Sequence, residues 1–168
     1  MVELLLMRMY PKCKVTKINS VRGSTGCWWY KQDNRVQDYV LRRKPDLLMI
    51  GGISHRNDTE AIREVIRQVR KTMQPEFVLM TGPFGRYDPV ADKNFRSTPD
   101  PEGKTYRSRL MRLAKEEKAE FIDMQGIWGT YIRKCGKPRL WFMRDVVHAN
   151  ERGSQILGRI LERSFAPK

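Results

Sequence analysis

Asp145 and His148 are the two residues of this sequence whose types and spacing are best suited to catalysis. A histidine three residues after an aspartate can have its Nδ1 proton held by the carboxylate, so that Nε2 is oriented outward as a general base. The pair immediately precedes a segment with helical periodicity, which predicts a loop leading into a helix. The alternative interpretation is structural: an aspartate at the start of a helix, beside a histidine whose hydrogen bonds are already satisfied.

The other histidine and the cysteines do not suggest a metal or disulfide site. We interpret His55, the second of two histidines, as a surface-loop residue. The sequence contains no HExxH motif and no cluster of carboxylates, the usual signs of a catalytic metal. Three widely spaced cysteines without a CxxC pair favour buried thiols over a zinc site or a disulfide framework; they are Cys13, Cys27 and Cys135.

The elements that must position these residues alternate between short apolar runs and amphipathic segments, the pattern of a parallel sheet covered by helices. Strands are predicted over residues 14–18, 46–50, 77–80 and 120–123. Helices are predicted over residues 32–42, 106–117, 127–134 and 151–165. A further helix, with Asn57 as its predicted N-cap, carries an apolar stripe of Ile62, Val65, Ile66 and Val69. Right-handed crossovers close such units into a three-layer α/β/α sandwich with a mostly parallel sheet, here a single domain over residues 1–168.

The loops at the carboxyl ends of the strands are where chemistry is expected, because ligands of such sheets bind there. These loops are residues 19–27, 51–58 and 81–86. Residues 84–104 continue as a long loop, and such loops are usually functional or mobile.

Three segments together resemble the SGNH (GDSL-like) hydrolase superfamily. DVVH followed by the amphipathic segment HANERGSQILGRILE is similar to its last block, in which Asp and His complete a triad with a serine. KPDLLMIGGIS is similar to its third block, where a buried strand delivers a Gly-x-Asn to the oxyanion hole. INSVRGSTG is similar to its second block, where a glycine N–H is another oxyanion donor, at Gly23 here. The resemblance extends from about Lys14 to Phe165 and implies an SGNH/flavodoxin-like fold with ester hydrolase activity.

Two positions depart from the superfamily pattern. The oxyanion asparagine is replaced by Ser54, whose hydroxyl donates one hydrogen bond over a shorter reach, and Asn57 is a stand-in from the same loop. The first block, a strand ending in Gly-Asp-Ser with the nucleophilic serine, is absent from the sequence.

The absent block leaves three explanations open. The family's first strand lies between the strands predicted over 14–18 and 46–50, and an empty slot there would expose unpaired backbone groups. The sequence is an N-terminally incomplete version of a longer enzyme, or residues 1–9 form a strand that fills the slot, or a neighbouring copy covers it in a homo-oligomer. Residues 1–9 align better with a helix, because Val2, Leu5, Leu6 and Met9 have helical spacing.

If the chain is catalytic without the first block, another serine must be the nucleophile. Ser24 and Ser54 are the leading candidates, and Ser20 is a weaker one. A glycine-flanked loop such as Gly23-Ser24-Thr25-Gly26 can make a sharp turn that exposes a hydroxyl beside backbone N–H groups. The structural alternatives are a turn-capping hydroxyl at Ser24 and an oxyanion donor at Ser54.

The net charge of +14, from 33 Lys and Arg against 19 Asp and Glu, favours anionic partners. No nucleic-acid-binding signature is present, so we expect a solvated basic surface without specific nucleic-acid binding. No apolar run reaches the roughly 18 residues of a membrane span and no signal-peptide pattern is present, so we expect a soluble chain of undecided compartment. Five aromatic residues could line a sugar or acyl group, although packing is their more common use: Trp28, Trp29, Tyr30, Trp128 and Trp141.

The sequence and the resemblance together predict a serine-type carboxylic ester hydrolase of short-chain acyl esters, among them acetylated carbohydrates. His148 is the predicted base, oriented by Asp145, and no cofactor is implied. The rival hypothesis is a non-catalytic relative that keeps the fold and binds glycans or polyanions.

Overall fold

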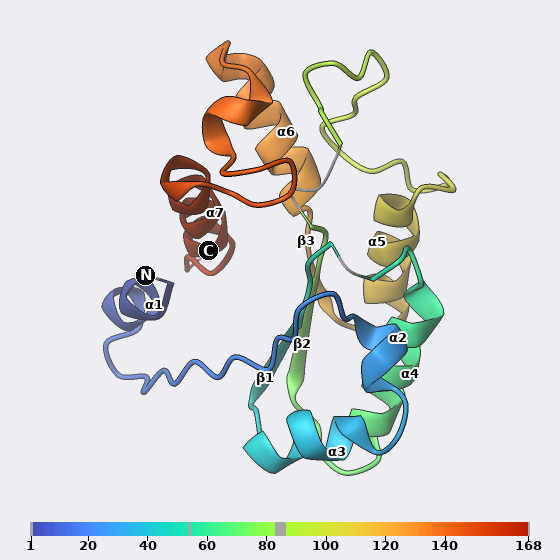
Figure 1. Cartoon of the computed structure of the whole chain (residues 1–168). Helices are drawn as coiled ribbons and strands as arrows, with labels where there is room; N and C mark the ends of the chain where they lie inside the picture. The colour runs from blue at the N-terminus through green and yellow to red at the C-terminus, as the bar shows by residue number, and fades with distance from the viewer. Residues whose placement is uncertain (1, 54, 83–86, 168) are drawn as a thin grey trace. The chain divides into compact units, whose positions relative to one another are not determined.

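A parallel β-sheet with helices around it forms the framework of the computed structural model, which describes residues 2–53, 55–82 and 87–167 (Figure 1). The chain divides into two compact units. We call Asn19–Gly82 with Pro99–Asp123 the sheet unit. We call Met1–Ile18 with Pro83–Thr98 and Met124–Lys168 the dyad unit, because it contains Asp145 and His148.

The sheet consists of three parallel strands in the order β1 (Leu47–Ile50), β2 (Glu76–Met80) and β3 (Glu120–Ile122). The register places Met49 opposite Val78, and Val78 opposite Glu120. The central strand is the most buried, since Phe77, Val78 and Leu79 are 0–3% exposed. Within the described sheet β1 pairs with β2 alone. The parallel α/β prediction is confirmed.

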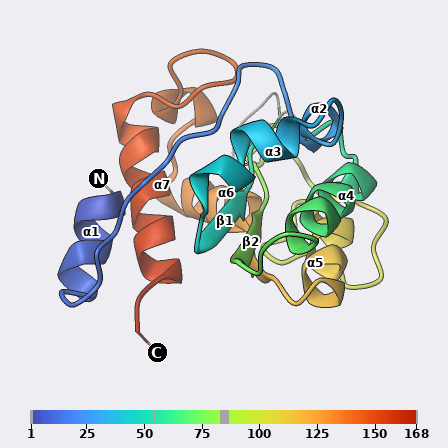
Figure 2. The same cartoon turned by 90° about the horizontal axis from the view of Figure 1, so that it is seen from below.

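Two long helices cover this sheet from one side (Figures 1 and 2). They are α4 (Thr59–Arg70) and α5 (Tyr106–Glu116), which contact each other, and α5 also contacts β2 and β3. The predicted apolar stripe of α4 is buried, as are Leu110, Leu113 and Ala114 of α5. Short helices precede the sheet in the sequence: α2 (Cys27–Tyr30), α3 (Arg35–Tyr39) and the 3-10 turn η1 (Leu41–Arg43). The last two replace the single helix predicted over 32–42.

The N-cap of α4 is Asp58 rather than Asn57. The Asp58 carboxylate accepts a hydrogen bond of 2.9 Å from the backbone N–H of Ala61. Asn57 instead has a left-handed backbone, with φ of 56°, and belongs to the preceding loop. The predicted cap was therefore wrong by one residue, because both residue types favour this position.

The dyad unit is helical. Helix α1 (Val2–Met9) lies beside α7 (Glu151–Ser164), and the Tyr10 hydroxyl donates to the Phe165 carbonyl at 2.6 Å (Figure 2). Helix α6 (Met124–Cys135) also contacts α7, and the 3-10 turn η2 (Arg139–Phe142) leads toward Asp145. The buried Trp128 ring of α6 meets the Phe142 ring edge-to-face at 5.3 Å.

Two predictions for the N-terminal part are corrected. The strand predicted over residues 14–18 is not formed: this segment pairs with no described strand, and Val15 is its one half-buried residue. A strand needs a neighbour for its backbone groups, and the segment has none. The explanation in which residues 1–9 form a strand is also wrong, because Val2–Met9 is the helix α1. Residues 87–104 contain no helix or strand, as predicted.

Candidate active site

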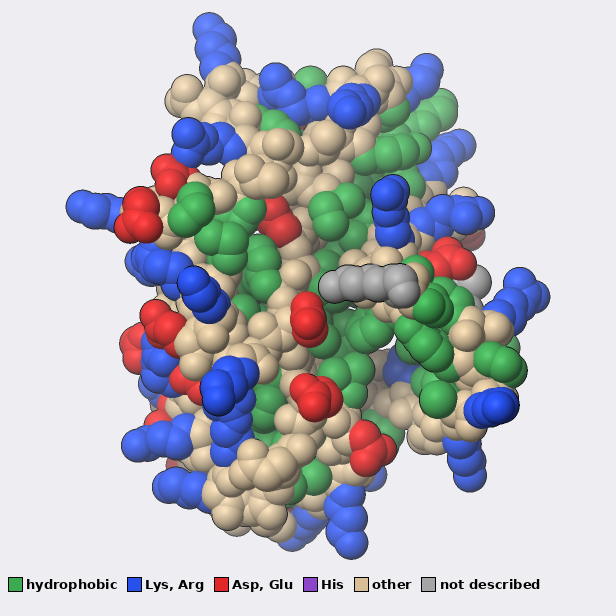
Figure 3. Space-filling view, turned by 180° about the vertical axis from the view of Figure 1, so that it is seen from behind, with side chains coloured by type: hydrophobic (Ala, Val, Ile, Leu, Met, Phe, Trp, Pro, Cys, Tyr) green, Lys and Arg blue, Asp and Glu red, His purple; other side chains and the backbone are tan. Residues whose placement is uncertain are grey.

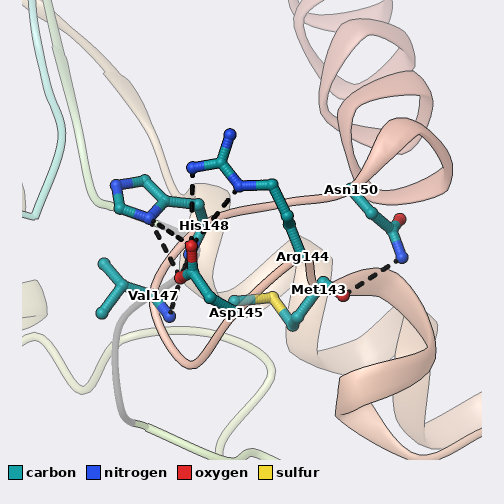
Figure 4. Close-up of polar contacts among 6 residues, drawn as sticks. All are labelled: Met143, Arg144, Asp145, Val147, His148 and Asn150. Atoms are coloured by element: carbon teal, nitrogen blue, oxygen red, sulfur yellow. Dashed lines mark hydrogen bonds and ion pairs between the residues drawn. The ribbon is translucent and has the colours of Figure 1, made fainter.

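A short hairpin between η2 and α7 carries Asp145 and His148 (Figure 4). Met143 and Ala149 form an antiparallel bridge at its base, and the N–H of Arg144 donates to the carbonyl of His148 at 2.8 Å. Asn150 closes it: its Oδ1 accepts from the N–H of Gly153 at 3.1 Å, capping α7. Its Nδ2 donates to the carbonyls of Trp141 and Met143, at 3.0 and 3.2 Å. The loop leading into a helix is confirmed.

The Asp145 carboxylate holds the imidazole of His148 by its Nδ1 (Figure 4). The distances from Nδ1 to Oδ2 and Oδ1 are 2.9 and 3.0 Å. Oδ1 also accepts from the backbone N–H groups of Val147 and His148, both at 2.8 Å. Nε2 of His148 has no hydrogen-bond partner among the described residues, and the side chain is 61% exposed. The arrangement leaves Nε2 accessible as a base.

The surroundings of Asp145 favour its ionised form. Hydrogen bonds from the backbone N–H groups of Val147 and His148, followed by the bond from the His148 ring, lower the pKa of Asp145 well below its usual range. The helix cap is Asn150 and not Asp145, so the structural alternative of an aspartate capping the helix is wrong. Asp145 instead forms a turn with the two residues that follow it.

The Gly23–Ser24 turn belongs to the sheet unit. Ser24 is exposed and left-handed, with φ of 57°, and its hydroxyl forms no hydrogen bond within the described part of the chain. The neighbouring Thr25 closes the turn, donating from its N–H and its hydroxyl to the Arg22 carbonyl at 3.4 and 2.9 Å. A turn-capping role therefore falls to Thr25. A side chain at Gly23 would meet nothing within 4 Å, so the turn is open on the side where that side chain would lie.

Ser20, the weaker nucleophile candidate, has a structural role, and Ser54, the second leading candidate, is not among the described residues. The Ser20 hydroxyl donates to the Tyr39 carbonyl at 2.6 Å, and the Ser20 carbonyl accepts from the Tyr30 hydroxyl. Ser54 lies outside the described residues, as do residues 83–86 of the loop after β2.

The loop that follows β1 has an unusual backbone. Gly52, Arg56 and Asn57 all have positive φ, of 111°, 52° and 56°. Such conformations are costly for residues other than glycine and persist where neighbours enforce them. The Asn57 side chain is exposed, while its carbonyl accepts from Nη2 of Arg109 at 2.9 Å.

His55 is not the surface residue that the sequence predicts. It is 7% exposed, and both ring nitrogens have partners: Nδ1 accepts from the N–H of Cys27 at 3.4 Å and Nε2 donates to the carbonyl of Gly51 at 3.0 Å. Burial lowers the pKa of His55. With both nitrogens occupied inside the protein, His55 is not available as a base for a substrate.

A buried ion pair at the carboxyl ends of β2 and β3 was not predicted from the sequence. Asp123, directly after β3, binds Nε and Nη2 of Arg107 at 3.0 and 2.5 Å, and Thr81, directly after β2, donates to it at 3.3 Å. Arg107 is 8% exposed, although arginine side chains usually lie at the surface. Thr81 directly follows the strand predicted over 77–80 and Asp123 is the last residue of the strand predicted over 120–123, and these positions were the available signal.

The predicted aromatic residues are distributed over both units. Trp29 contacts the rings of Tyr30 and Tyr39, at 5.0 and 5.4 Å, in the sheet unit. In the dyad unit Trp128 is buried, whereas Trp141 is 47% exposed, with the guanidinium of Arg152 at 4.6 Å from its ring centre. Trp141 is therefore the residue of this set best placed to meet a ligand.

The basic residues are scattered over the surface, and arginines of α4 are paired with carboxylates. Figure 3 shows Lys and Arg side chains spread over the face in view, interspersed with Asp and Glu. On α4, Arg63 binds Glu116 and Glu117 at 2.6 and 2.9 Å, and Arg70 binds Glu117 at 2.5 Å. Nearby carboxylates thus compensate the polar face of α4.

The structure can be compared with the sequence-based expectations about metal binding, membrane insertion and buried thiols. No group of three His, Cys, Asp or Glu side chains in the described ranges could hold a metal ion. None of the described helices is long and apolar enough to cross a membrane. Cys27 is buried, which raises the pKa of its thiol to about 12, while Cys135 is half-buried and Cys13 is exposed. Exposed Cys13 departs from the prediction of buried thiols.

Comparison with known proteins finds an esterase of similar sequence and several enzymes of similar fold. No family model matches the chain. The uncharacterised esterase YxiM of Bacillus subtilis (strain 168) is 29% identical over 104 residues, which are 60% of this chain and 26% of that protein. This chain thus spans about a quarter of the relative's length. The crystal structure of YxiM is similar with a TM-score of 0.69 at 24% identity, over 96% of this chain and 48% of that one.

Two further crystal structures share the fold. The acetyl xylan esterase AlAXEase has a TM-score of 0.62 at 17% identity, over 86% of this chain and 78% of that one. A protein of Parabacteroides merdae ATCC 43184, described as a GDSL-like lipase, has a TM-score of 0.60 at 16% identity, over 84% of this chain and 68% of that one. At these identities the similarity concerns the fold.

Proposed function

Because the chain has the α/β fold of the SGNH (GDSL-like) hydrolases, we propose that it is a carboxylic ester hydrolase in which His148 is the general base and Asp145 orients it. The observation that carries the proposal is the dyad geometry. Both carboxylate oxygens of Asp145 lie within 3.0 Å of Nδ1 of His148, and Nε2 is exposed without a protein partner in the described chain.

The proposed chemistry follows from that geometry. Nε2 takes the proton of a serine hydroxyl while the oxygen attacks the acyl carbon, and the proton is then passed to the leaving alkoxide. Water, activated by the same nitrogen, cleaves the acyl-enzyme and releases the acid. Throughout, the ionised Asp145 stabilises the imidazolium that forms.

The nucleophile is proposed to be Ser24 or Ser54. Ser24 is favoured because it is exposed in a left-handed turn, next to Gly23, where a side chain would meet nothing within 4 Å. The proposed oxyanion donors are the Gly23 N–H and the side chains of Ser54 and Asn57. Donors of this kind contribute about 2.7–4 kcal/mol to transition-state stabilisation.

The proposed substrates are short-chain acyl esters, with acetylated carbohydrates as the leading class. The similarity to an acetyl xylan esterase supports this class. The exposed Trp141 ring, carried by the turn that precedes the dyad hairpin, offers an apolar surface of the kind that sugars use.

The alternative function is glycan or polyanion binding without catalysis. The specific observation in its favour is that the sequence contains no Gly-Asp-Ser motif. The two functions differ in whether turnover depends on His148.

The test is hydrolysis of a short-chain aryl ester by the wild type and by His148→Ala, Ser24→Ala and Ser54→Ala, each checked for folding by circular dichroism. Ser154→Ala, at an exposed position of α7, is the matched control and keeps wild-type activity. We expect His148→Ala and one of the two loop-serine variants to fall to background. Wild-type turnover no faster than that of His148→Ala would reject the esterase proposal for this substrate class and favour the binding alternative.

A further inference from the structure

His55 connects three segments of the sheet unit. Its Nδ1 accepts from the N–H of Cys27, the first residue of α2, and its Nε2 donates to the carbonyl of Gly51, directly after β1. Its own carbonyl accepts from the N–H of Asp58, the N-cap of α4, at 2.9 Å. One residue therefore ties the end of β1 to the starts of two helices.

The two partners determine the protonation state of the ring. A backbone N–H can only donate and a carbonyl can only accept, so Nδ1 carries no proton and Nε2 carries one. The neutral imidazole is the form that makes both bonds. A protonated ring would turn a second N–H toward the N–H of Cys27, and this contact would be repulsive.

The loop that His55 holds is under conformational strain. Arg56 and Asn57 are both left-handed, and such residues persist only where surrounding contacts enforce them. Two contacts besides His55 do so. The Arg56 guanidinium lies 3.8 Å from the ring centre of Trp28 in α2, and Arg109 of α5 binds the Asn57 carbonyl.

We propose that neutral His55 is a positioning residue that holds the described parts of the loop after β1, residues 51–53 and 55–58, against the start of α2. This loop contains Ser54 and Asn57, and the segment joined to it through Cys27 begins at the Gly23–Ser24 turn. His55 thereby fixes the backbone beside Asn57, a proposed oxyanion donor, and the start of α2, which follows the Gly23–Ser24 turn. The catalytic part of this inference rests on the proposed function, whereas the loop contact does not.

Acid should release this contact. The groups that face His55 or its partners are Asp58 of the same loop, Cys27 of α2, and Tyr106 and Arg109 of α5. Because burial lowers the pKa of folded His55, the unfolded chain binds the proton first as the pH falls below about 6.5. Stability is therefore lost from that pH downward, and the hydrogen bond from Cys27 is lost with it.

Three variants of His55 test separately the contributions of its two ring hydrogen bonds, from Cys27 and to Gly51. The amide of His55→Asn places an acceptor where Nδ1 lies and keeps the bond from Cys27. The amide of His55→Gln places a donor where Nε2 lies and keeps the bond to Gly51. His55→Leu loses both. The measurements are hydrogen exchange of the Cys27 amide, referenced to the Leu79 amide of β2, and the kcat and KM of ester hydrolysis.

We expect exchange at Cys27 to rise about tenfold in His55→Leu and His55→Gln, the loss of one hydrogen bond, and to stay near wild type in His55→Asn. In the wild type, protection should fall with pH below about 6.5 after correction for intrinsic exchange, and in His55→Asn it should not. We expect kcat to fall about 10- to 100-fold in His55→Leu with little change in KM.

The two proposals fail separately. Unchanged Cys27 exchange in His55→Leu, or protection that is independent of pH in the wild type, would overturn the loop contact. Raised exchange with unchanged kcat would overturn the positioning role. The absence of hydrolysis in the wild type would overturn the proposed function and the catalytic part of this inference, while exchange would still decide the loop contact. His148→Ala is the control, since it stops hydrolysis and leaves Cys27 exchange unchanged.

Discussion

At the scale of the residue, Asp145 combines two tasks in one carboxylate. It accepts two backbone N–H groups from its own turn, and it holds the Nδ1 proton of His148. The turn fixes the carboxylate before any substrate arrives, so the tautomer of His148 is set by a local and preorganised contact. This locality explains how an exposed pair, 61% and 43% accessible, keeps one geometry.

Asp145→Asn tests the tautomer directly. The amide oxygen can still accept the backbone N–H groups, but the amide N–H group facing the ring forces Nδ1 to accept and Nε2 to carry the proton. A protonated Nε2 is no base, so we expect kcat to fall about 10³- to 10⁴-fold with the fold intact. The control is Arg144→Gln, which removes an exposed ion pair 3.4 Å from Asp145 and should change kcat little. Equal activities of the two variants would contradict the assigned role.

The pairing of Asp145 with His148 could be predicted because it depends on residues close in sequence. The rest of the candidate site could not be predicted, because it depends on residues far apart in sequence. A spacing of three residues before a helix is visible in the sequence, whereas the environment of His55 depends on Cys27, 28 positions away. His55 was therefore mistaken for a surface residue, and the nucleophile could not be chosen among the serines. The burial of Arg107 on α5 was not predictable for the same reason, since its partner Asp123 follows strand β3.

At the scale of the element, the hairpin of the dyad depends on how closely η2 approaches α7. Gly153, in the first turn of α7, lies under the Phe142 carbonyl, which a Cβ at Gly153 would approach to 2.3 Å. The same carbonyl accepts the N–H of Asn150 at 3.1 Å. The glycine therefore permits the backbone contact that closes the base of the hairpin.

The substitution Gly153→Ala should increase the distance between η2 and α7. The added methyl meets backbone rather than a flexible side chain, so we expect the free energy of unfolding to fall by about 1–3 kcal/mol. We also expect kcat to fall, because the hairpin carries His148. Urea unfolding and ester hydrolysis measure the two effects, and Ser154→Ala, exposed at the next position, should stay within about 0.5 kcal/mol of wild type. A Gly153→Ala protein as stable and active as wild type would show that the close approach is unimportant.

Element prediction succeeded where periodicity was strong. The apolar stripe of α4 and the continuous apolar run of β1 were identified by pattern and length. The strand predicted over residues 14–18 failed, because a strand requires a partner and its lysine-rich sequence buries only Val15 in part. The helix predicted over 32–42 begins only at Arg35, after the left-handed Asn34, and it is divided at Val40, which leaves the helical conformation with φ of −120°.

At the scale of the whole molecule, the net charge of +14 acts through its field rather than through a dedicated patch. Arginines of α4 are compensated by Glu116 and Glu117 at short distance, so long-range attraction dominates over specific anion contacts. Such attraction is screened over about 8 Å at physiological ionic strength.

Salt should therefore discriminate between substrates by charge. For an anionic ester, kcat/KM should fall as ionic strength rises, whereas for a neutral ester of the same acyl group it should stay constant. Arg63→Gln should leave this salt dependence nearly unchanged, because Arg63 is already paired. Identical salt profiles for both esters would show that the field does not reach the reacting site.

Because the two histidines differ in exposure, His148 can be modified selectively by a chemical reagent. The His55 ring is 7% exposed with both nitrogens occupied, while the His148 side chain is 61% exposed with an accessible Nε2. A histidine-selective acylating reagent should label the folded protein once, at His148, and the unfolded protein twice. Labelling then measures the accessibility of the dyad alone, and substrates that reach it will be recognisable by the protection they give.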